Sequence, residues 1–193
     1  MKQILIILVL TSILGLNVSA QKGLAAGAKA PTFMGVDQNG NKIDLQNILK
    51  KHQSVVLFFY RGQWCPYCNK QIKELQDSLQ LLTAKNAYVI GVTPETADNI
   101  AKTIKKTKAG FSIIQDKDDE IMKAYGVNFM MDDATFAKYK GFGVDLEMNN
   151  GNTRHTLPVP ATYIIDRSGK IKFVYFDPNY KKRASISNIL TQL

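Results

Sequence analysis

Cysteine and histidine are scarce in this sequence, whose 193 residues contain two of each. A structural zinc site needs four ligands at the corners of a tetrahedron. Every such residue in the chain would have to bind one ion: Cys65, Cys68, His52 and His155. Because this arrangement is strained, we expect no metal site, and the two cysteines need another explanation.

Long hydrophobic runs are also missing, apart from one near the N-terminus. Residues 4–16 are mostly apolar, but a helix that spans a bilayer needs roughly 20 such residues. Lys2 precedes this run and Val18-Ser19-Ala20 follows it, which is the three-part pattern of a secretory signal peptide. We expect residues 1–20 to be a signal peptide. The remaining chain is then secreted across the inner membrane and is periplasmic or extracellular, with no membrane span after cleavage.

Arginine is rare among the basic residues. The formal net charge is +9, but only four of the 25 basic residues are arginine, the side chain best suited to phosphate recognition. The basic residues form short, scattered clusters without interleaved aromatic residues, so we expect a solvated surface and no nucleic-acid partner. Repeats and low-complexity tracts are absent, and 45% hydrophobic residues fit one globular domain over residues 21–193.

After residue 50 the chain alternates between strand patterns and helix patterns. Apolar runs predict strands at 54–61, 87–93, 111–115, 161–166 and 171–176. Helical patterns occupy about 66–82, 94–108, 118–125 and 183–192. An Asn-Gly turn predicts a hairpin at 33–45, and residues 127–158 form an inserted segment with a short helix near 132–140. The order predicts an α/β fold with a central mixed sheet flanked by helices.

The two cysteines lie where a strand pattern gives way to a helix pattern. Pro66 fits the first helical position, so Cys65 takes the N-cap beside unpaired N–H groups and the positive end of the helix dipole. We expect this position to lower the pKa of Cys65 and to leave its thiol exposed. Cys68 begins the apolar stripe of the helix and is expected to be buried and less acidic. The asymmetry predicts a redox pair, with Cys65 as nucleophile and Cys68 as resolving thiol.

A purely structural disulfide is the weaker interpretation of this pair. A bond between Cys65 and Cys68 closes a loop of very few residues. Such a short loop removes little conformational entropy from the unfolded chain.

Two stretches together resemble the thioredoxin superfamily. Trp64-Cys65-Pro66-Tyr67-Cys68 is similar to its Trp-Cys-x-x-Cys site, and LPVPATYIID at 157–166 is similar to its strand after a cis-proline. YRGQWCPYC, the turn at 166–170 and DPNYKKR at 177–183 resemble the alkyl hydroperoxide reductase/thiol-specific antioxidant (AhpC/TSA) branch, in its peroxiredoxin-like subgroup with a CxxC site. The resemblance covers about residues 26–193.

This resemblance implies a thioredoxin-like fold and a redox-active Cys65–Cys68 disulfide, with no other cofactor. It further implies three substrate-positioning residues. Pro160 would be the cis-proline that faces the dithiol, Val159 would pair with substrate through its backbone, and Trp64 would form part of the substrate surface. Arg61, four residues before Cys65, is a possible thiolate stabiliser or a solvated cation at the strand end.

The chain departs from peroxiredoxins at the groups that bind peroxide. The proline and threonine before their peroxidatic cysteine correspond to Phe58 and Gly62, and Pro160 stands where their catalytic arginine precedes the strand. A thiolate without these groups loses much of the transition-state stabilisation that peroxide cleavage requires.

The chain departs from thioredoxins as well. Their buried acid corresponds to Phe59, and the glutamate of membrane-tethered cytochrome-maturation thioredoxins corresponds to Gln71. Glu74 and Glu95 have the chemistry to replace that acid. We expect both to be surface charges, since glutamate is mostly exposed.

Three functions remain open from the sequence. The leading hypothesis is an exported thiol-disulfide oxidoreductase that acts on protein or small-molecule disulfides with a thioredoxin-type electron donor. The alternative is a thiol peroxidase that reduces hydroperoxides through Cys65 and resolves the sulfenic acid with Cys68. A remote alternative is a Cu(I)-binding chaperone in which His155 joins the two thiolates, although the CxxC spacing is one residue shorter than in such chaperones.

Overall fold

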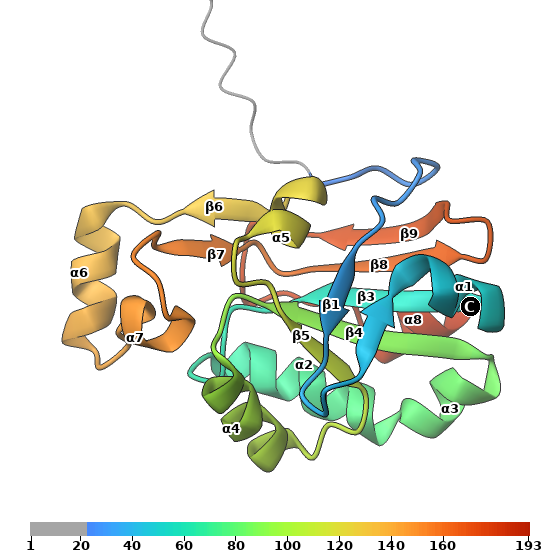
Figure 1. Ribbon diagram of the computed structural model, residues 1–193, viewed down its shortest axis with the longest axis horizontal. Helices are drawn as coiled ribbons and strands as arrows, with labels where there is room; N and C mark the ends of the chain where they lie inside the picture. The colour runs from blue at the N-terminus through green and yellow to red at the C-terminus, as the bar shows by residue number, and fades with distance from the viewer. Residues whose placement is uncertain (1–22) are drawn as a thin grey trace, which may run out of the picture.

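The computed structural model describes residues 23–193, and the expected signal peptide at 1–20 lies outside them. A five-stranded mixed sheet occupies the centre, with strand order β5-β4-β3-β8-β9 (Figure 1). The strands are β3 (Ser54–Phe59), β4 (Ala87–Thr93), β5 (Ser112–Gln115), β8 (Ala161–Asp166) and β9 (Ile171–Phe176). β3 pairs in parallel with β4 and antiparallel with β8, so it is buried along its whole length.

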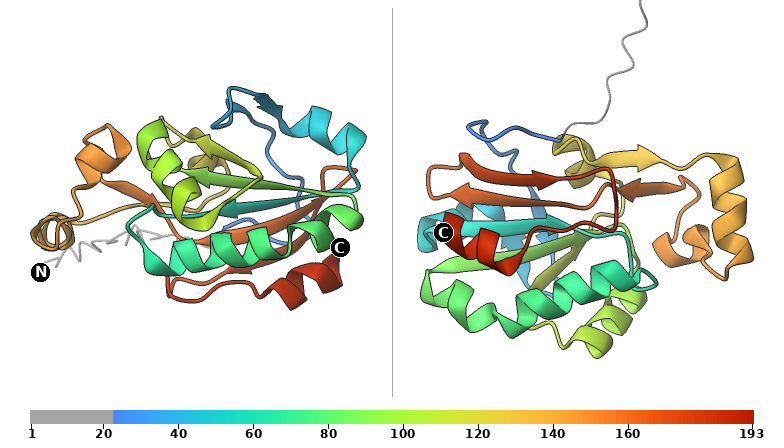
Figure 2. Two further views of the ribbon diagram at one scale, coloured as in Figure 1. Left: turned by 90° about the horizontal axis from the view of Figure 1, so that it is seen from below. Right: turned by 180° about the vertical axis from the view of Figure 1, so that it is seen from behind.

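Two hydrophobic cores lie on the two faces of this sheet. Successive side chains of a strand point to opposite faces, so Val55 and Leu57 of β3 enter one core while Val56 and Phe58 enter the other. The first core packs against α1 (Leu45–Lys51) and α5 (Glu120–Ala124). The second packs against α2 (Pro66–Asp77), α3 (Leu79–Ala84), α4 (Ala97–Thr107) and α8 (Ile186–Gln192). Figure 2 shows α2 and α8 side by side on one face of the sheet. The predicted α/β architecture is confirmed.

The N-terminal hairpin is present as expected. β1 (Met34–Val36) pairs antiparallel with β2 (Lys42–Asp44), and Gly40 in the turn takes a φ of +79°. Glycine adopts this left-handed conformation without the steric penalty that a Cβ brings.

The inserted segment contains more regular structure than its sequence predicted. β6 (Asn128–Met130) pairs antiparallel with β7 (Thr156–Pro158), and α6 (Asp133–Gly141) and α7 (Leu146–Asn150) lie between them. The short helix expected near 132–140 is α6. Residues 128–158 project from one end of the sheet as a unit, which we call the arm (Figure 1).

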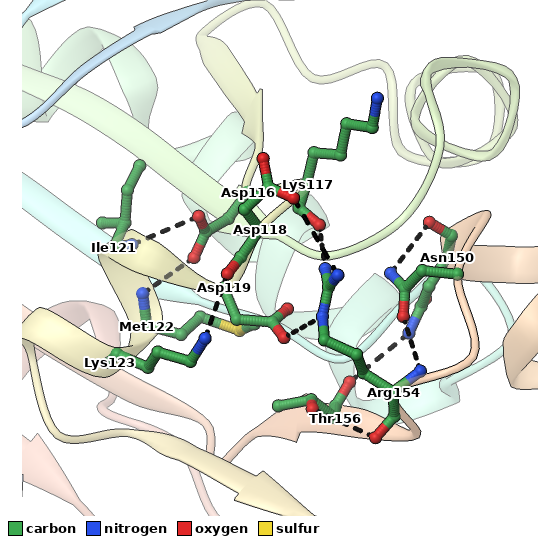
Figure 3. A network of polar contacts seen from close by, with 11 residues as sticks. Asp116, Lys117, Asp118, Asp119, Ile121, Met122, Lys123, Asn150, Arg154 and Thr156 are labelled. Carbon is green, nitrogen blue, oxygen red and sulfur yellow. Dashed lines mark hydrogen bonds and ion pairs between the residues drawn. The ribbon is translucent and has the colours of Figure 1, made fainter.

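Arg154 ties the base of the arm to the loop before α5 (Figure 3). Its Nε donates to Oδ2 of Asp119 at 2.7 Å, and its Nη2 donates to the carbonyl of Lys117. Asp119 is buried, and the exclusion of water strengthens its attraction to the guanidinium. The same loop is fixed from the other side by Asp116, whose carboxylate accepts from N–H groups at the start of α5. The arm is thereby anchored to the domain.

None of the helices within residues 23–193 combines the length and the hydropathy needed to cross a membrane.

Candidate active site

The dithiol lies at the end of β3, where the sequence placed it. Cys65 is the N-cap of α2 and Pro66 is the first helical residue, as expected. Both cysteines are free thiols, and they are only 1% and 0% exposed. The prediction that Cys65 is exposed is therefore wrong. The reason is tertiary: both thiols pack in the second core, and Trp64 and Tyr67 lie against that core.

The acidity of the two thiols is the reverse of the prediction. The hydrogen bond between the thiol of Cys65 and the sulfur of Cys68, together with burial, raises the pKa of Cys65. Burial also acts to raise the pKa of Cys68, but the bond from Cys65 and the positive charge of Arg183 outweigh it and lower that pKa. The hydrogen bond between the two sulfurs and the charge of Arg183 thus favour a thiolate on Cys68.

Arg183 is a site residue that the sequence did not reveal. Its Nη2 lies 3.4 Å from Sγ of Cys68, and its Nε donates to Oε1 of Gln71 at 2.8 Å. In the sequence Arg183 ends a Lys-Lys-Arg cluster, a pattern that predicts exposed surface charge. The one available signal was that the stretch DPNYKKR, which ends at Arg183, resembles the CxxC subgroup.

Arg61 is buried rather than solvated. It is 3% exposed, and its Nη2 donates to the hydroxyl of Tyr139 at 2.7 Å. Its guanidinium carbon lies 5.2 Å from the ring of Trp64, 5.5 Å from that of Tyr139 and 4.6 Å from that of Tyr180, within cation–π range. Its charge also acts to lower the pKa of Cys65. Tyr139 of α6 therefore connects the arm to Arg61, which lies four residues before Cys65.

Trp64 connects the second core to the arm. Its ring meets that of Tyr139 edge to face, with centroids 5.7 Å apart, and it packs against both the second core and the core of the arm. Its partly buried position leaves the expected role in the substrate surface a prediction.

Glu95 is a buried acid beside the dithiol, and the expectation of a surface charge is wrong. It is 0% exposed, and its Oε2 accepts from the backbone N–H of Gln63 at 2.7 Å. Its other oxygen, Oε1, is buried without a hydrogen-bond partner within residues 23–193. Burial raises the pKa of Glu95 to about 8, and the negative charge of Cys68 contributes to the rise.

Topology explains how Glu95 reaches the site. α4 begins at Ala97 with Thr96 as its N-cap, and not near Pro94 as predicted, because Thr93 is still paired in β4 with Gln115 of β5. The turn between β4 and α4, which contains Glu95, therefore lies at the same end of the sheet as the CxxC loop, because β3 and β4 are parallel. Glu74, in contrast, is partly exposed and pairs with Lys70 on the surface at 3.8 Å.

Gly62 leaves the space that Glu95 and Trp64 occupy. A Cβ at this position would lie 2.5 Å from Oε1 of Glu95 and 2.5 Å from Nε1 of Trp64. We expect Gly62→Ala to lower the free energy of unfolding by about 1–3 kcal/mol through overpacking. Denaturant unfolding measures this loss. Gly141→Ala is the control, since no atom of residues 23–193 approaches a Cβ there within 4 Å; equal losses would contradict this account.

Pro160 lies at the expected end of the sheet but differs in geometry. The register pairs Ala161 with Phe59, so the buried Pro160 is next to the end of β3 where the CxxC loop begins. No peptide bond within residues 23–193 is cis, so the expected cis-proline is a trans-proline here. The backbone N–H of Val159 donates to the carbonyl of Val127 at 2.7 Å. That N–H is engaged by the residue that precedes β6 rather than free for substrate.

The histidines lie elsewhere. His155 is in the arm, where its Nε2 lies 3.0 Å from Oε1 of Glu147 and its ring stacks on Phe136 at 3.6 Å. His52 contacts Asn86 on the surface at 3.0 Å. Within residues 23–193, no three or more histidine, cysteine and acidic side chains form a cluster that could hold a metal ion.

Residues 26–174 match the model of the AhpC/TSA family. The chain belongs to this family. Over 152 residues it is 28% identical to a putative chloroplastic peroxiredoxin Q of Oryza sativa subsp. indica. The matched region is 79% of this chain and 59% of the plant protein. The chain thus spans less than two thirds of that relative. Over 175 residues it is 25% identical to the thiol-disulfide oxidoreductase ResA of Bacillus cereus, covering 88% of this chain and 83% of ResA.

A comparison with solved structures supports the fold described above. The crystal structure of peroxidoxin BcpB from Mycobacterium tuberculosis matches with a TM-score of 0.66 at 18% identity, over 86% of this chain and 94% of that one. The predicted thioredoxin-like fold is confirmed.

Proposed function

We propose that this protein is an exported thiol-disulfide oxidoreductase that works through the Cys65/Cys68 dithiol. The observation that carries the proposal is the placement of a cation and a buried acid around Cys68: Arg183 contacts its sulfur, and Glu95 lies close enough for their charges to interact. Arg183 and Glu95 can both act on the second cysteine, which has to gain and lose a proton in each round of exchange. The sequence similarity to ResA points the same way.

The first step is attack on a substrate disulfide by Cys65. In the reduced pair, the hydrogen bond between the two sulfurs allows the proton of Cys65 to pass to Cys68, which leaves the thiolate on Cys65. That sulfur forms a bond to one substrate sulfur while the substrate S–S bond breaks. The other substrate sulfur leaves as a thiolate, and Cys65 is now in a mixed disulfide.

The second step requires Cys68 to lose its proton again. Cys65 no longer carries an S–H group that could stabilise a Cys68 thiolate, so burial favours the neutral thiol. Glu95 is the nearby carboxylate that takes this proton, and its pKa of about 8 lies close to that of a thiol. The Cys68 thiolate then attacks Cys65, closes the internal disulfide and releases the reduced substrate. A thioredoxin-type donor returns two electrons to the Cys65–Cys68 bond.

A peroxidase that reduces hydroperoxides remains the second candidate, since peroxiredoxin Q is among the relatives. In that reaction peroxide would oxidise Cys65 to a sulfenic acid, and Cys68 would condense with it, releasing water. Phe58 and Gly62 stand where peroxiredoxins carry proline and threonine, and neither side chain can donate a hydrogen bond to peroxide. Disulfide exchange is therefore the better supported reaction.

The rate constants of the wild-type protein with the two oxidants test the proposal. Trp64 is the only tryptophan and precedes Cys65 directly, so its fluorescence reports oxidation in a stopped-flow instrument. We expect hydrogen peroxide to react no faster than with a free thiol, while catalytic amounts of protein reduce insulin disulfides. Rapid oxidation by peroxide without insulin reduction would overturn the proposal and favour the peroxidase.

A further inference from the structure

The guanidinium of Arg183 is held in place by three polar groups of the chain besides the sulfur of Cys68. Its Nε donates to Oε1 of Gln71, and its Nη1 donates to the backbone carbonyls of Tyr180 and Lys182. Gln71 is itself buried and donates through Nε2 to Oγ1 of Thr162 at 3.2 Å. The Nη2 group, aimed at Sγ of Cys68 at 3.4 Å, is thus preorganised by contacts that involve no substrate.

The neighbouring lysines do not share this role. Lys182 is exposed and pairs with Asp177 at 3.4 Å, and Lys181 is exposed as well. The basic cluster at 181–183 therefore sends one cation inward and two outward. Arg183 is half-buried beside a sulfur that is 0% exposed, and removing part of a charge from water is costly unless the charge is paired.

We propose that Arg183 is a catalytic residue that stabilises the Cys68 thiolate and thereby makes the Cys65–Cys68 disulfide easier to reduce. The proposal deepens the function proposed above and rests on it for its physiological meaning. Arg183 touches the reacting atom directly. It acts on the second cysteine of the motif, whereas the helix N-terminus acts on the first.

The redox step shows why the contact matters. When a donor thiolate attacks Cys65, the internal S–S bond breaks and its electron pair leaves with Cys68 as a thiolate. A second donor thiolate then attacks the donor sulfur of the mixed disulfide, the bond from that sulfur to Cys65 breaks, Cys65 leaves as a thiolate that takes up a proton, and the two donor sulfurs are joined in a disulfide. Arg183 stabilises the charge that develops on Cys68, so it favours the reduced form of the pair.

Several other groups set the charge at Cys68. Glu95 opposes the thiolate with its negative charge when it is ionised, and Tyr60 is buried nearby with a raised pKa that keeps its hydroxyl neutral. Cys65 donates its hydrogen bond, and Arg61 adds a second positive charge on the side of Cys65. Among these groups, Arg183 is the cation with a direct contact to the Cys68 sulfur.

Arg183→Gln tests the proposal, with Arg167→Gln as the matched control. Arg167 is a surface arginine whose Nη2 donates to the carbonyl of Lys50, and it follows the end of β8 that pairs with the start of β3, opposite the end where the CxxC loop begins. The ultraviolet absorbance of the thiolate, followed against pH, should show the first pKa of the dithiol rising by about 1–3 units in Arg183→Gln. Equilibration with glutathione should show about a tenfold loss of the reduced form for each unit, which is about 30 mV. Arg167→Gln should change neither quantity.

Arg183→Lys separates charge from structure. Lysine keeps the positive charge but lacks the planar fork, so we expect a shift of the same sign and smaller size. If Arg183→Gln does not fold, this variant decides the question by the same two measurements. A thiolate titration and a glutathione equilibrium equal to those of the wild type would overturn the role of Arg183. Because neither measurement uses a protein substrate, the outcome is independent of whether the protein reduces insulin, which tests the proposed function.

Discussion

Replacing Cys68 with serine is expected to stop the protein after one exchange. Cys65 can still attack a substrate disulfide, but no second sulfur is present to break the mixed disulfide that results. Multiple-turnover reduction of insulin should fall by roughly 100-fold or more, the scale seen when a residue of a covalent mechanism is removed. A substrate or glutathione adduct should accumulate on Cys65, and intact-protein mass spectrometry detects its added mass.

Cys65→Ser is the matched control for this trapping experiment. It keeps one buried thiol, but that thiol is the one contacted by Arg183 and packed in the second core. We expect neither turnover nor an adduct of comparable yield. If Cys68→Ser turned over like the wild type, or if the adduct formed on Cys68 in Cys65→Ser, the assignment of nucleophile and resolving thiol would be wrong.

Glu95→Gln is expected to make the protein more stable and less active. The folded protein holds the Glu95 carboxyl at a pKa of about 8, against an ordinary value of 4.5. Between these two values the folded state binds a proton that the unfolded state has released, so the free energy of unfolding falls as pH rises through this range and levels off above it. Glutamine has no charge to desolvate, and its amide oxygen can still accept from the N–H of Gln63.

The gain from Glu95→Gln should therefore be small below about pH 4.5 and reach on the order of 3 kcal/mol near neutral pH. Resolution of the mixed disulfide should slow by about 10²–10⁴-fold, the contribution typical of a general base, whereas formation of the mixed disulfide should change little. Denaturant unfolding against pH and single-turnover kinetics measure the two effects. Glu74→Gln, on the exposed face of α2, should show neither. A stability profile for Glu95→Gln that keeps the wild-type slope between pH 4.5 and 8 would refute the buried carboxylate.

The long apolar strands and the position of the CxxC motif could be predicted from the sequence. The strands at 87–93, 161–166 and 171–176 appear at the predicted bounds. The first two are apolar runs buried on both faces, and the third is a largely apolar, partly buried strand at the edge of the sheet. The arm could not be predicted in detail. Its strands, β6 and β7, have three residues each, which is too short for any periodicity to show, and 25 residues, from 131 to 155, separate them along the chain.

The charges at the site were the least predictable part. The helix N-terminus is a local feature, so it suggested an acidic Cys65. The pKa of Cys68 is lowered instead by the hydrogen bond from Cys65 and by Arg183, which lies 115 residues further along the chain. Glu95 was hidden for a similar reason. It follows Thr93-Pro94, which is a common helix start, and only the parallel pairing of β3 with β4 places this turn beside the CxxC loop.

Both sulfurs are buried, and the Arg61 side chain before them contacts rings from separate parts of the chain. Arg61 joins these parts, because Tyr139 comes from the arm, Tyr180 from the loop before α8 and Trp64 from the motif itself. Because Cys65 is only 1% exposed, the sulfur of a protein disulfide can meet it only after side chains around it have moved. Exchange with a protein disulfide therefore requires a local opening around Cys65 before the sulfurs can react.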